Sequence, residues 1–185
     1  ALAACGDGGY QADETTAAAT APAADAAQPA TAGVTDPQIA AIVVAANHVD
    51  IQAGELARTR ASDPRVREFA ERMVTDHTGV NKAAGDLVAK LGVTPEENPT
   101  SRQLTQGGEQ NRASLRGKSG VEFDRAYIDH EVAYHQQVLD AIDQTLIPGA
   151  QKAELKALLQ QTRPAVAAHL QHAREIQSSL GGGQG

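Results

Sequence analysis

The sequence predicts an all-α fold, a four-helix bundle whose middle connection is long enough to cross from one end to the other. The 185-residue chain contains no Trp, two Phe and three Tyr. Its core must therefore be built from Ala, Val, Leu and Ile, which suits close-packed helices better than a β-sandwich. Four long segments place apolar residues at helical spacing, and no segment alternates as a strand would. The connection between the second and third segments, residues 93–120, is rich in Pro, Gly, Asn and Ser and favours a crossover topology.

The first two helices carry clear start signals. Residues 36–61 begin with Asp36, expected as the N-cap, followed by Pro37 at the first helical position. The second helix repeats this Asp-Pro start at Asp63 and is expected to end at Gly92, because glycine readily adopts the left-handed backbone that closes a helix.

The second half of the chain predicts one short helix and two long ones. The short helix is expected within the crossover connection, over residues 101–116. A third long helix covers residues 121–146 and ends at Pro148–Gly149. The fourth covers residues 151–180, where Pro164 is expected to kink or divide it.

The first 35 residues are expected to precede the bundle. "LAAC", Leu2 to Cys5, followed by a glycine, resembles the cleavage end of a bacterial lipoprotein signal, whose Cys becomes the lipidated first residue. The alternative is a chance Cys in an Ala-rich leader. The residues that follow offer little to bury, which predicts disorder. The predicted division is 1–5 for the end of the signal, 6–35 for a disordered linker, 36–180 for the bundle domain and 181–185 for a flexible tail.

Charge and hydropathy exclude several kinds of partner. The chain has 16 basic and 23 acidic residues, a formal net charge of −7, and lacks the clustered basic face that nucleic-acid binding requires. No apolar run approaches the roughly 20 residues of a membrane-spanning helix. A lipid on Cys5 would instead hold the protein at the exported face of a bacterial membrane, on the periplasmic or extracellular side. The sequence indicates no particular protein partner and leaves a homo-oligomer open.

Several polar residues fall on the apolar stripes of the predicted helices. They are Asp50 on the first helix, His77 on the second, Glu131 and His135 on the third, and His169 on the fourth. A helix rises about 1.5 Å per residue, so a crossover connection gathers these groups near mid-height of a bundle about 40 Å long. Simple up-down-up-down connectivity would scatter them by about 10 Å. Three further histidines lie off the stripes and are predicted at the surface: His48, His130 and His172.

Buried imidazoles and carboxylates are costly unless they are paired or bind a metal. Aspartate or glutamate with two or three histidines is a reasonable set of ligands for zinc, iron or copper. The pattern therefore predicts a metal site with Glu131 as a ligand or supporting group and four ligands: Asp50, His77, His135 and His169. In the alternative, each histidine forms a hydrogen bond with a neighbour and stiffens the core; the candidate neighbours are Asp76, Tyr127 and Tyr134.

Four blocks of the sequence carry a family likeness. "ANHVDIQAGELA", "VREFAERMVTDH", "FDRAYIDHEVAYH" and "PAVAAHLQHA" resemble the ferritin-like bacterial family known as domain of unknown function 4142, over residues 36–180. The resemblance implies a ferritin-like helical fold and an exported or lipid-anchored location, without an established activity. Its recurrent acid maps to Asp50 and its recurrent histidines map to His77, His135 and His169.

The chain departs from the di-iron ferritins in one respect. Those proteins use Glu-x-x-His on two of their helices, whereas the pair here is Glu131-x-x-x-His135 and no Glu-x-x-His occurs anywhere. A standard ferroxidase centre is therefore not expected, and a His-rich site for one metal ion is the better prediction.

Three functional hypotheses remain. The first is an exported metal-binding protein, and the second is a non-catalytic envelope protein for adhesion, stress protection or partner binding whose histidines are structural. The third is an oxidase or peroxide-handling enzyme, which would need open coordination positions on the metal. Because the chain lacks a nucleophile elbow and a phosphate-binding glycine loop, a non-enzymatic role is favoured. Metal-binding histidines must be neutral, so affinity is expected to fall below a pH of about 6.5.

Overall fold

The secondary structure of residues 33–181, the part described by a computed structural model, is entirely helical. The elements in chain order are α1 (Asp36–Arg60), α2 (Pro64–Leu91), α3 (Pro99–Arg116), α4 (Gly120–Ala141), a π-helical segment η1 (Ile142–Leu146), a single turn α5 (Ile147–Gly149) and α6 (Ala153–Gly181). No strand occurs in the described residues, so the all-α prediction is confirmed. Cys5 and most of the predicted linker lie outside them.

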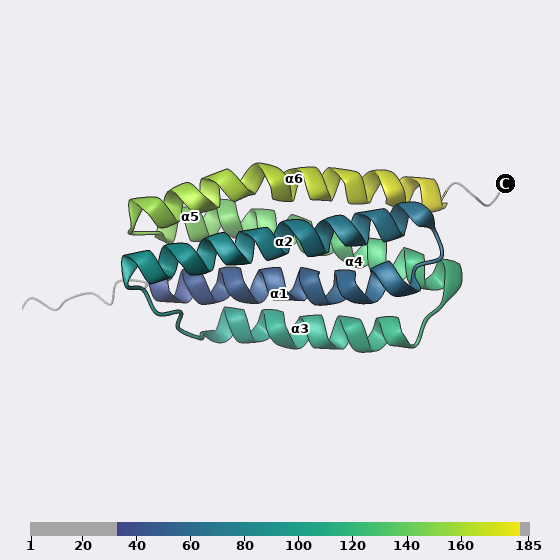
Figure 1. The fold of residues 1–185 in the computed structure, drawn as a ribbon, viewed down its shortest axis with the longest axis horizontal. Helices are drawn as coiled ribbons and strands as arrows, with labels where there is room; N and C mark the ends of the chain where they lie inside the picture. The colour runs from purple at the N-terminus through teal and green to yellow at the C-terminus, as the bar shows by residue number, and fades with distance from the viewer. Residues whose placement is uncertain (1–32, 182–185) are drawn as a thin grey trace, which may run out of the picture. The chain divides into compact units, whose positions relative to one another are not determined.

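Helix α3 carries the chain back along the bundle before α4 begins. The hairpin of α1 and α2 is followed by α3, which returns the chain to the end where α2 started (Figure 1). Helix α4 therefore runs in the same direction as α2, and α6 in the same direction as α1 (Figure 1). Helix α1 contacts both α2 and α3, and α4 packs on α6. The predicted crossover is confirmed, with a helix of 18 residues as its main part.

The start of α1 differs from the prediction in one residue. Thr35, not Asp36, is the N-cap, and it forms a capping box with Gln38. The buried carboxylate of Asp36 accepts hydrogen bonds from the backbone N–H groups of Gln151 (2.8 Å) and Lys152 (3.0 Å) instead. Asp36 thus ties the start of α1 to the turn that precedes α6.

A second buried carboxylate fixes the α1–α2 turn. Asp124 on α4 is 1% exposed and accepts hydrogen bonds from the backbone N–H groups of Ser62 and Asp63, each at 2.9 Å, and from the Ser62 hydroxyl. Asp63 is the N-cap of α2, as predicted. Helix α2 also ends as predicted, at Gly92 in the left-handed conformation with φ of 63°.

Two glycines allow helices to approach closely. A Cβ atom built on Gly54 of α1 would lie 3.0 Å from the carbonyl oxygen of Ala70 on α2. One built on Gly108 of α3 would lie 2.7 Å from Cγ2 of Val49 on α1. Any larger side chain at either position would push the neighbouring helix outward.

The two long helices of the C-terminal half follow the prediction closely. The third long helix ends at Pro148–Gly149 as predicted, with η1 and α5 as its last part. Pro164 lies inside α6 without dividing it. Its ring faces solvent, so the local bend that a proline imposes does not disturb the core.

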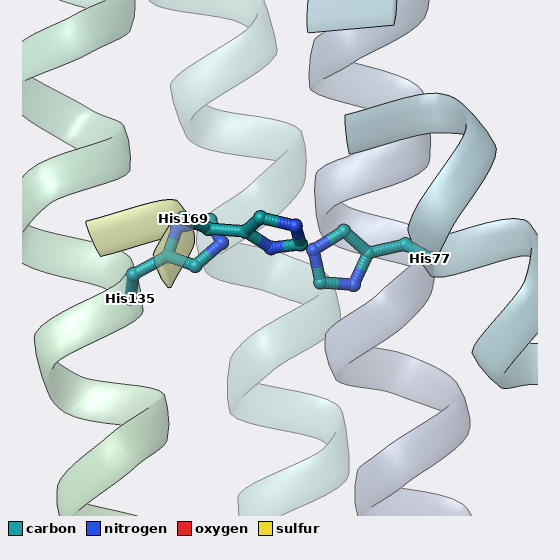
Figure 2. Close-up of side chains that lie close together, drawn as sticks. All are labelled: His77, His135 and His169. Carbon is teal, nitrogen blue, oxygen red and sulfur yellow. The ribbon is translucent and has the colours of Figure 1, made fainter. Parts of the chain in front are cut away.

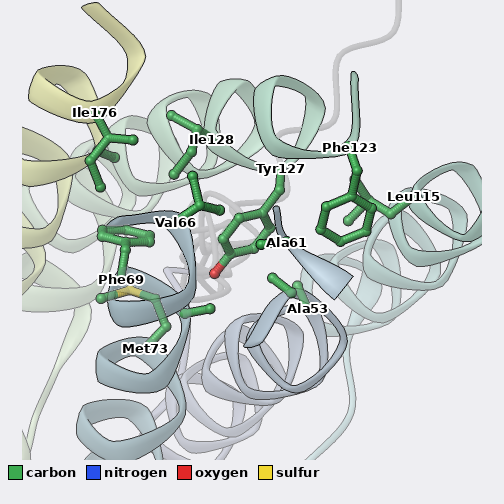
Figure 3. Packing of buried hydrophobic residues seen from close by; sticks show 13 residues of the cluster. Ala53, Ala61, Val66, Phe69, Met73, Leu115, Phe123, Tyr127, Ile128 and Ile176 are labelled. Carbon is green, nitrogen blue, oxygen red and sulfur yellow. The ribbon is translucent and has the colours of Figure 1, made fainter. Parts of the chain in front are cut away.

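The apolar core consists of two clusters at opposite ends of the bundle. One lies toward the α1–α2 turn and contains Phe69, Phe123 and Tyr127 (Figure 3). The other lies toward the α4–α6 connection and contains Leu139 and Leu159. A layer of polar side chains separates the two. Within the described part of the chain, no helix combines the length and apolar character of a membrane span.

Candidate metal centre

The polar layer is assembled from all four long helices. It contains Asp50 of α1, His77 of α2, Glu131 and His135 of α4, and His169 of α6, none more than 5% exposed. Figure 2 shows the three imidazoles pointing toward one another from three different helices. The structure therefore brings together all five residues that the sequence singles out, and it does so through the crossover that the prediction required.

The ligand atoms form two overlapping groups. One nitrogen from each of His77, His135 and His169 lies within 4.8 Å of the other two, and Asp50, Glu131 and His135 form a second group within the same distance. His77 Nε2 is 3.5 Å from Asp50 Oδ2, which joins the groups on a second side. The two groups share His135, and within the described residues no larger group meets the same distance.

The amide of Asn47 fixes the His77 ring. Asn47 Nδ2 donates to the carbonyl oxygen of Val43 at 2.9 Å, so its Oδ1 is the atom that faces His77 Nδ1 at 2.7 Å. An amide oxygen only accepts, so Nδ1 of the ring carries the proton and Nε2 carries a lone pair. The sequence reading missed Asn47, although it lies three residues before Asp50 on the same face of α1.

The other two rings are fixed in the same way. His135 Nδ1 faces the backbone carbonyl oxygen of Glu131 at 3.0 Å, and His169 Nε2 faces Asp76 Oδ2 at 2.9 Å. Both partners are acceptors, so each ring donates from that nitrogen and keeps a lone pair on the other. We call His77 Nε2, His135 Nε2 and His169 Nδ1 the lone-pair nitrogens. Among residues 33–181 none of the three finds a hydrogen-bond partner.

The imidazoles are neutral at physiological pH. Burial, together with the charges that His135 and His169 would carry, lowers the pKa of His77 to about 3. Burial and a charged His169 lower the pKa of His135 to about 4. Burial also lowers the pKa of His169, against the opposing effect of its bond to Asp76. Neutral imidazole is the form that binds metal ions.

The pKa values of the two carboxyl groups are shifted in the opposite direction, upward. Burial raises the pKa of Asp50 well above its ordinary value, and burial and the charge of Asp50 do the same for Glu131. Asp50 Oδ1 and both side-chain oxygens of Glu131 lack a hydrogen-bond partner in the described region, and Glu131 Oε2 lies 3.4 Å from His135 Nδ1. A cation between the helices would favour loss of these protons and would offset the cost of burying two carboxylates.

The predicted neighbours of the histidines are only partly correct. Asp76 contacts His169, whereas the Tyr134 hydroxyl donates to the carbonyl oxygen of Ala46. The Tyr127 hydroxyl has no partner within residues 33–181. Burial, and then the charges of Glu131 and Asp50, raise the pKa of Tyr127, so it stays protonated.

The surface prediction for the other histidines is correct for His48 and wrong for two. His48 is exposed, but His130 is partly buried and stacks on Tyr134 with ring centroids 5.5 Å apart. His172 is partly buried with its ring 5.4 Å from that of Phe69. Both sit at the margins of the helix stripes, where packing against neighbouring aromatic rings decides burial.

Three nitrogens and one or two carboxylate oxygens can hold a metal ion. Such a set suits four-coordinate zinc and also iron or copper with further ligands. A ring whose second nitrogen donates to a carbonyl, amide or carboxylate is the usual support of metal-bound histidine. All three histidines here have this support.

Comparison with known proteins identifies one family. No curated protein and no solved structure matches the chain, so the ferritin-like designation stays a prediction. The family model described as "Domain of unknown function (DUF4142)" matches residues 19–176. That match covers most of the 185 residues, and the chain therefore belongs to this family.

Proposed function

We propose that this protein binds one transition-metal ion in the core of its bundle. The three lone-pair nitrogens coordinate the ion together with a carboxylate oxygen of Asp50 or Glu131. Zinc, iron and copper all suit this set of ligands. The role is binding, and a reaction at the metal is not part of the proposal.

The observation that supports this function best is the state of the lone-pair nitrogens. Each belongs to a buried ring whose other nitrogen is already bonded, and each of the three rings brings a nitrogen within 4.8 Å of a nitrogen of the other two. A buried polar atom without a partner costs about 1–3 kcal/mol. In a purely structural cluster all three nitrogens would remain unsatisfied and would destabilise the fold. A metal ion would instead supply each of them with a partner.

The proposed location is the exported face of a bacterial membrane. It rests on the sequence around Cys5, which is outside the described residues. In bacteria expressing the protein behind a lipoprotein leader, labelled fatty acid should enter the wild type and not the Cys5→Ser variant. Equal labelling of the two proteins, or no labelling of either, would contradict the anchor.

Metal content tests the binding function. We expect the purified protein, incubated with zinc, iron(II) or copper(II) and then desalted, to retain about one ion per chain of at least one metal by mass spectrometry. A His135→Ala/His169→Ala variant should lose it. A His48→Ala variant should keep it, because His48 is exposed.

The competing function is a non-catalytic envelope protein with structural histidines. It would be supported if the wild type retained no ion and its melting temperature did not shift with any of the three metals. Retention of the same metal by both histidine variants would also contradict the proposed site.

A further inference from the structure

An apolar cavity adjoins the candidate metal centre. It has a volume of about 90 Å³, and Asn47, Asp50 and His77 line one part of it. The remaining lining is mostly aliphatic and comes from six elements, with Ile42, Val80, Leu104, Val138, Ile142 and Val166 among its residues. The ligands of the proposed ion therefore form a polar patch in the wall of an otherwise apolar space.

The cavity suits a small nonpolar occupant better than water. A buried water needs two to four polar partners, and a cavity of about 150 Å³ lined by Leu, Ile and Phe stays dry and binds benzene or xenon. Here most of the lining is aliphatic, and the buried polar atoms without a partner in the described lining belong to Asp50 and His77. Thr162 donates its hydroxyl to the carbonyl oxygen of Leu158 at 2.9 Å, and both ends of the Asn47 amide are bonded.

The cavity reaches the surface between α3 and α4. Thr100 and Gln137 are exposed, and both line it together with the half-buried Leu104. The same three residues line a surface pocket between these helices. The crossover helix thus forms one wall of a path from solvent toward His77.

The π-helical segment also forms part of the cavity wall. Ile142 and Leu146, its first and last residues, both line the cavity. A π-turn inserts an extra residue into a helix and shifts the register of the side chains that follow it, and such turns are frequent at functional sites. The π-helical turn therefore places Ile142 and Leu146 in the wall of the cavity.

We propose that the cavity binds a small, uncharged, nonpolar molecule of the size of dioxygen, at a position beside the metal ion. Binding in the cavity follows from its size and lining alone. The position beside an ion rests on the proposed function, and the two parts can be tested separately.

Xenon is the probe for the first part. Crystals of the metal-free protein under xenon pressure should show xenon density within the cavity. A Val166→Phe variant, which places a ring in the cavity, should lose this density. The matched Val121→Phe variant should keep it, because Val121 is 57% exposed and lies outside the cavity lining.

The wild-type crystal already decides this part, so the test does not depend on the folding of Val166→Phe. Val138→Phe provides a second filled cavity on another helix. A cavity without xenon, or one filled by a chain of ordered waters, would overturn the proposal.

Cobalt(II) and zinc test the second part by ¹²⁹Xe nuclear magnetic resonance. Paramagnetic cobalt in the centre should shorten the relaxation time of bound xenon relative to the zinc-loaded protein. Equal relaxation with both metals bound would overturn the adjacency. Xenon binding in a protein that retains none of zinc, iron(II), copper(II) or cobalt(II) would refute the proposed function and leave the cavity site standing.

Discussion

Each histidine of the candidate metal centre uses one ring nitrogen to fix its own orientation. The acceptors are the Asn47 amide, the Glu131 backbone carbonyl and the Asp76 carboxylate. These three groups decide which nitrogen carries the proton, and so which one can coordinate. The centre is therefore defined by these three acceptors as much as by the side chains that would coordinate the ion.

Asn47 offers the cleanest test of this arrangement. In an Asn47→Ala variant the His77 ring loses its acceptor and its fixed tautomer, so metal affinity should fall by about 10–100-fold, as is usual when such supporting groups are removed. Competition with a chromogenic chelator measures the change. His48→Ala, a substitution of the adjacent exposed residue, serves as the control, and equal affinity of both variants would contradict the role of Asn47.

Helix α3 positions the centre by joining α2 to α4 in the direction that brings the ligands to one height. It lies against α1 over Gly108, where the two helices come too close for a side chain. The adjacent Gly107 is exposed, and no described atom lies within 4 Å of a Cβ built on it. The two neighbouring glycines of one helix therefore predict opposite effects of the same substitution.

Gly108→Ala should destabilise the protein. The new methyl group would meet Val49 at 2.7 Å, and overpacking of this kind costs about 1–3 kcal/mol, which outweighs a helix-propensity gain of at most about 1 kcal/mol. Gly107→Ala should instead stabilise it by up to about 1 kcal/mol, because only the propensity gain remains. Urea unfolding measures both, and a stabilising Gly108→Ala would show that α3 is not held tightly on α1.

The sequence predicts the helices and their inward faces well, because both depend on apolar spacing along one segment. The capping of helix ends, and the burial of residues at the edge of an apolar stripe, depend on contacts with residues far away in the chain. Asp36 looks like an N-cap from its own neighbours, and its true bonds are to residues 151 and 152. His130 looks exposed on α4, and its burial depends on Tyr134 and the nearby α3. The role of Asn47 depends on its contact with His77, 30 residues away in the chain, and so is not indicated by its own neighbours.

The bundle as a whole has two apolar ends and a polar centre. In the metal-free protein this centre contains neutral imidazoles and carboxyl groups whose pKa values burial raises. In the folded metal-free chain the pKa values of His77 and His135 are about 3 and 4, well below that of a free imidazole. The fall in metal affinity below a pH of about 6.5 stays a prediction, and Asp50 and Glu131, whose pKa values are raised, are the groups whose protons would compete with the ion.

Stability of the metal-free protein should depend on pH through both kinds of group. The pKa of these histidines is lower in the folded chain than in the unfolded chain. Below about pH 6.5 the unfolded chain therefore binds more protons, and the free energy of unfolding falls as pH decreases toward 4. Above about pH 4.5 the folded carboxyls keep protons that the unfolded chain releases, so their contribution is lost as pH rises through their raised pKa.

Glu131→Gln isolates the second effect. The amide does not titrate, so in the presence of chelator the variant should gain stability relative to the wild type as pH rises from 5 to 8. Urea unfolding at intermediate pH values measures the trend. A constant difference between the two proteins over this range would mean that Glu131 is not protonated in the folded state.

The most direct test of the metal centre is an anomalous-scattering map of a crystal of the metal-loaded protein. The structure predicts one peak within about 2.0–2.2 Å of His77 Nε2, His135 Nε2 and His169 Nδ1, with a carboxylate oxygen of Asp50 or Glu131 completing the ligands. A peak elsewhere, or no peak and an ordered water bonded to these three nitrogens, would contradict the account.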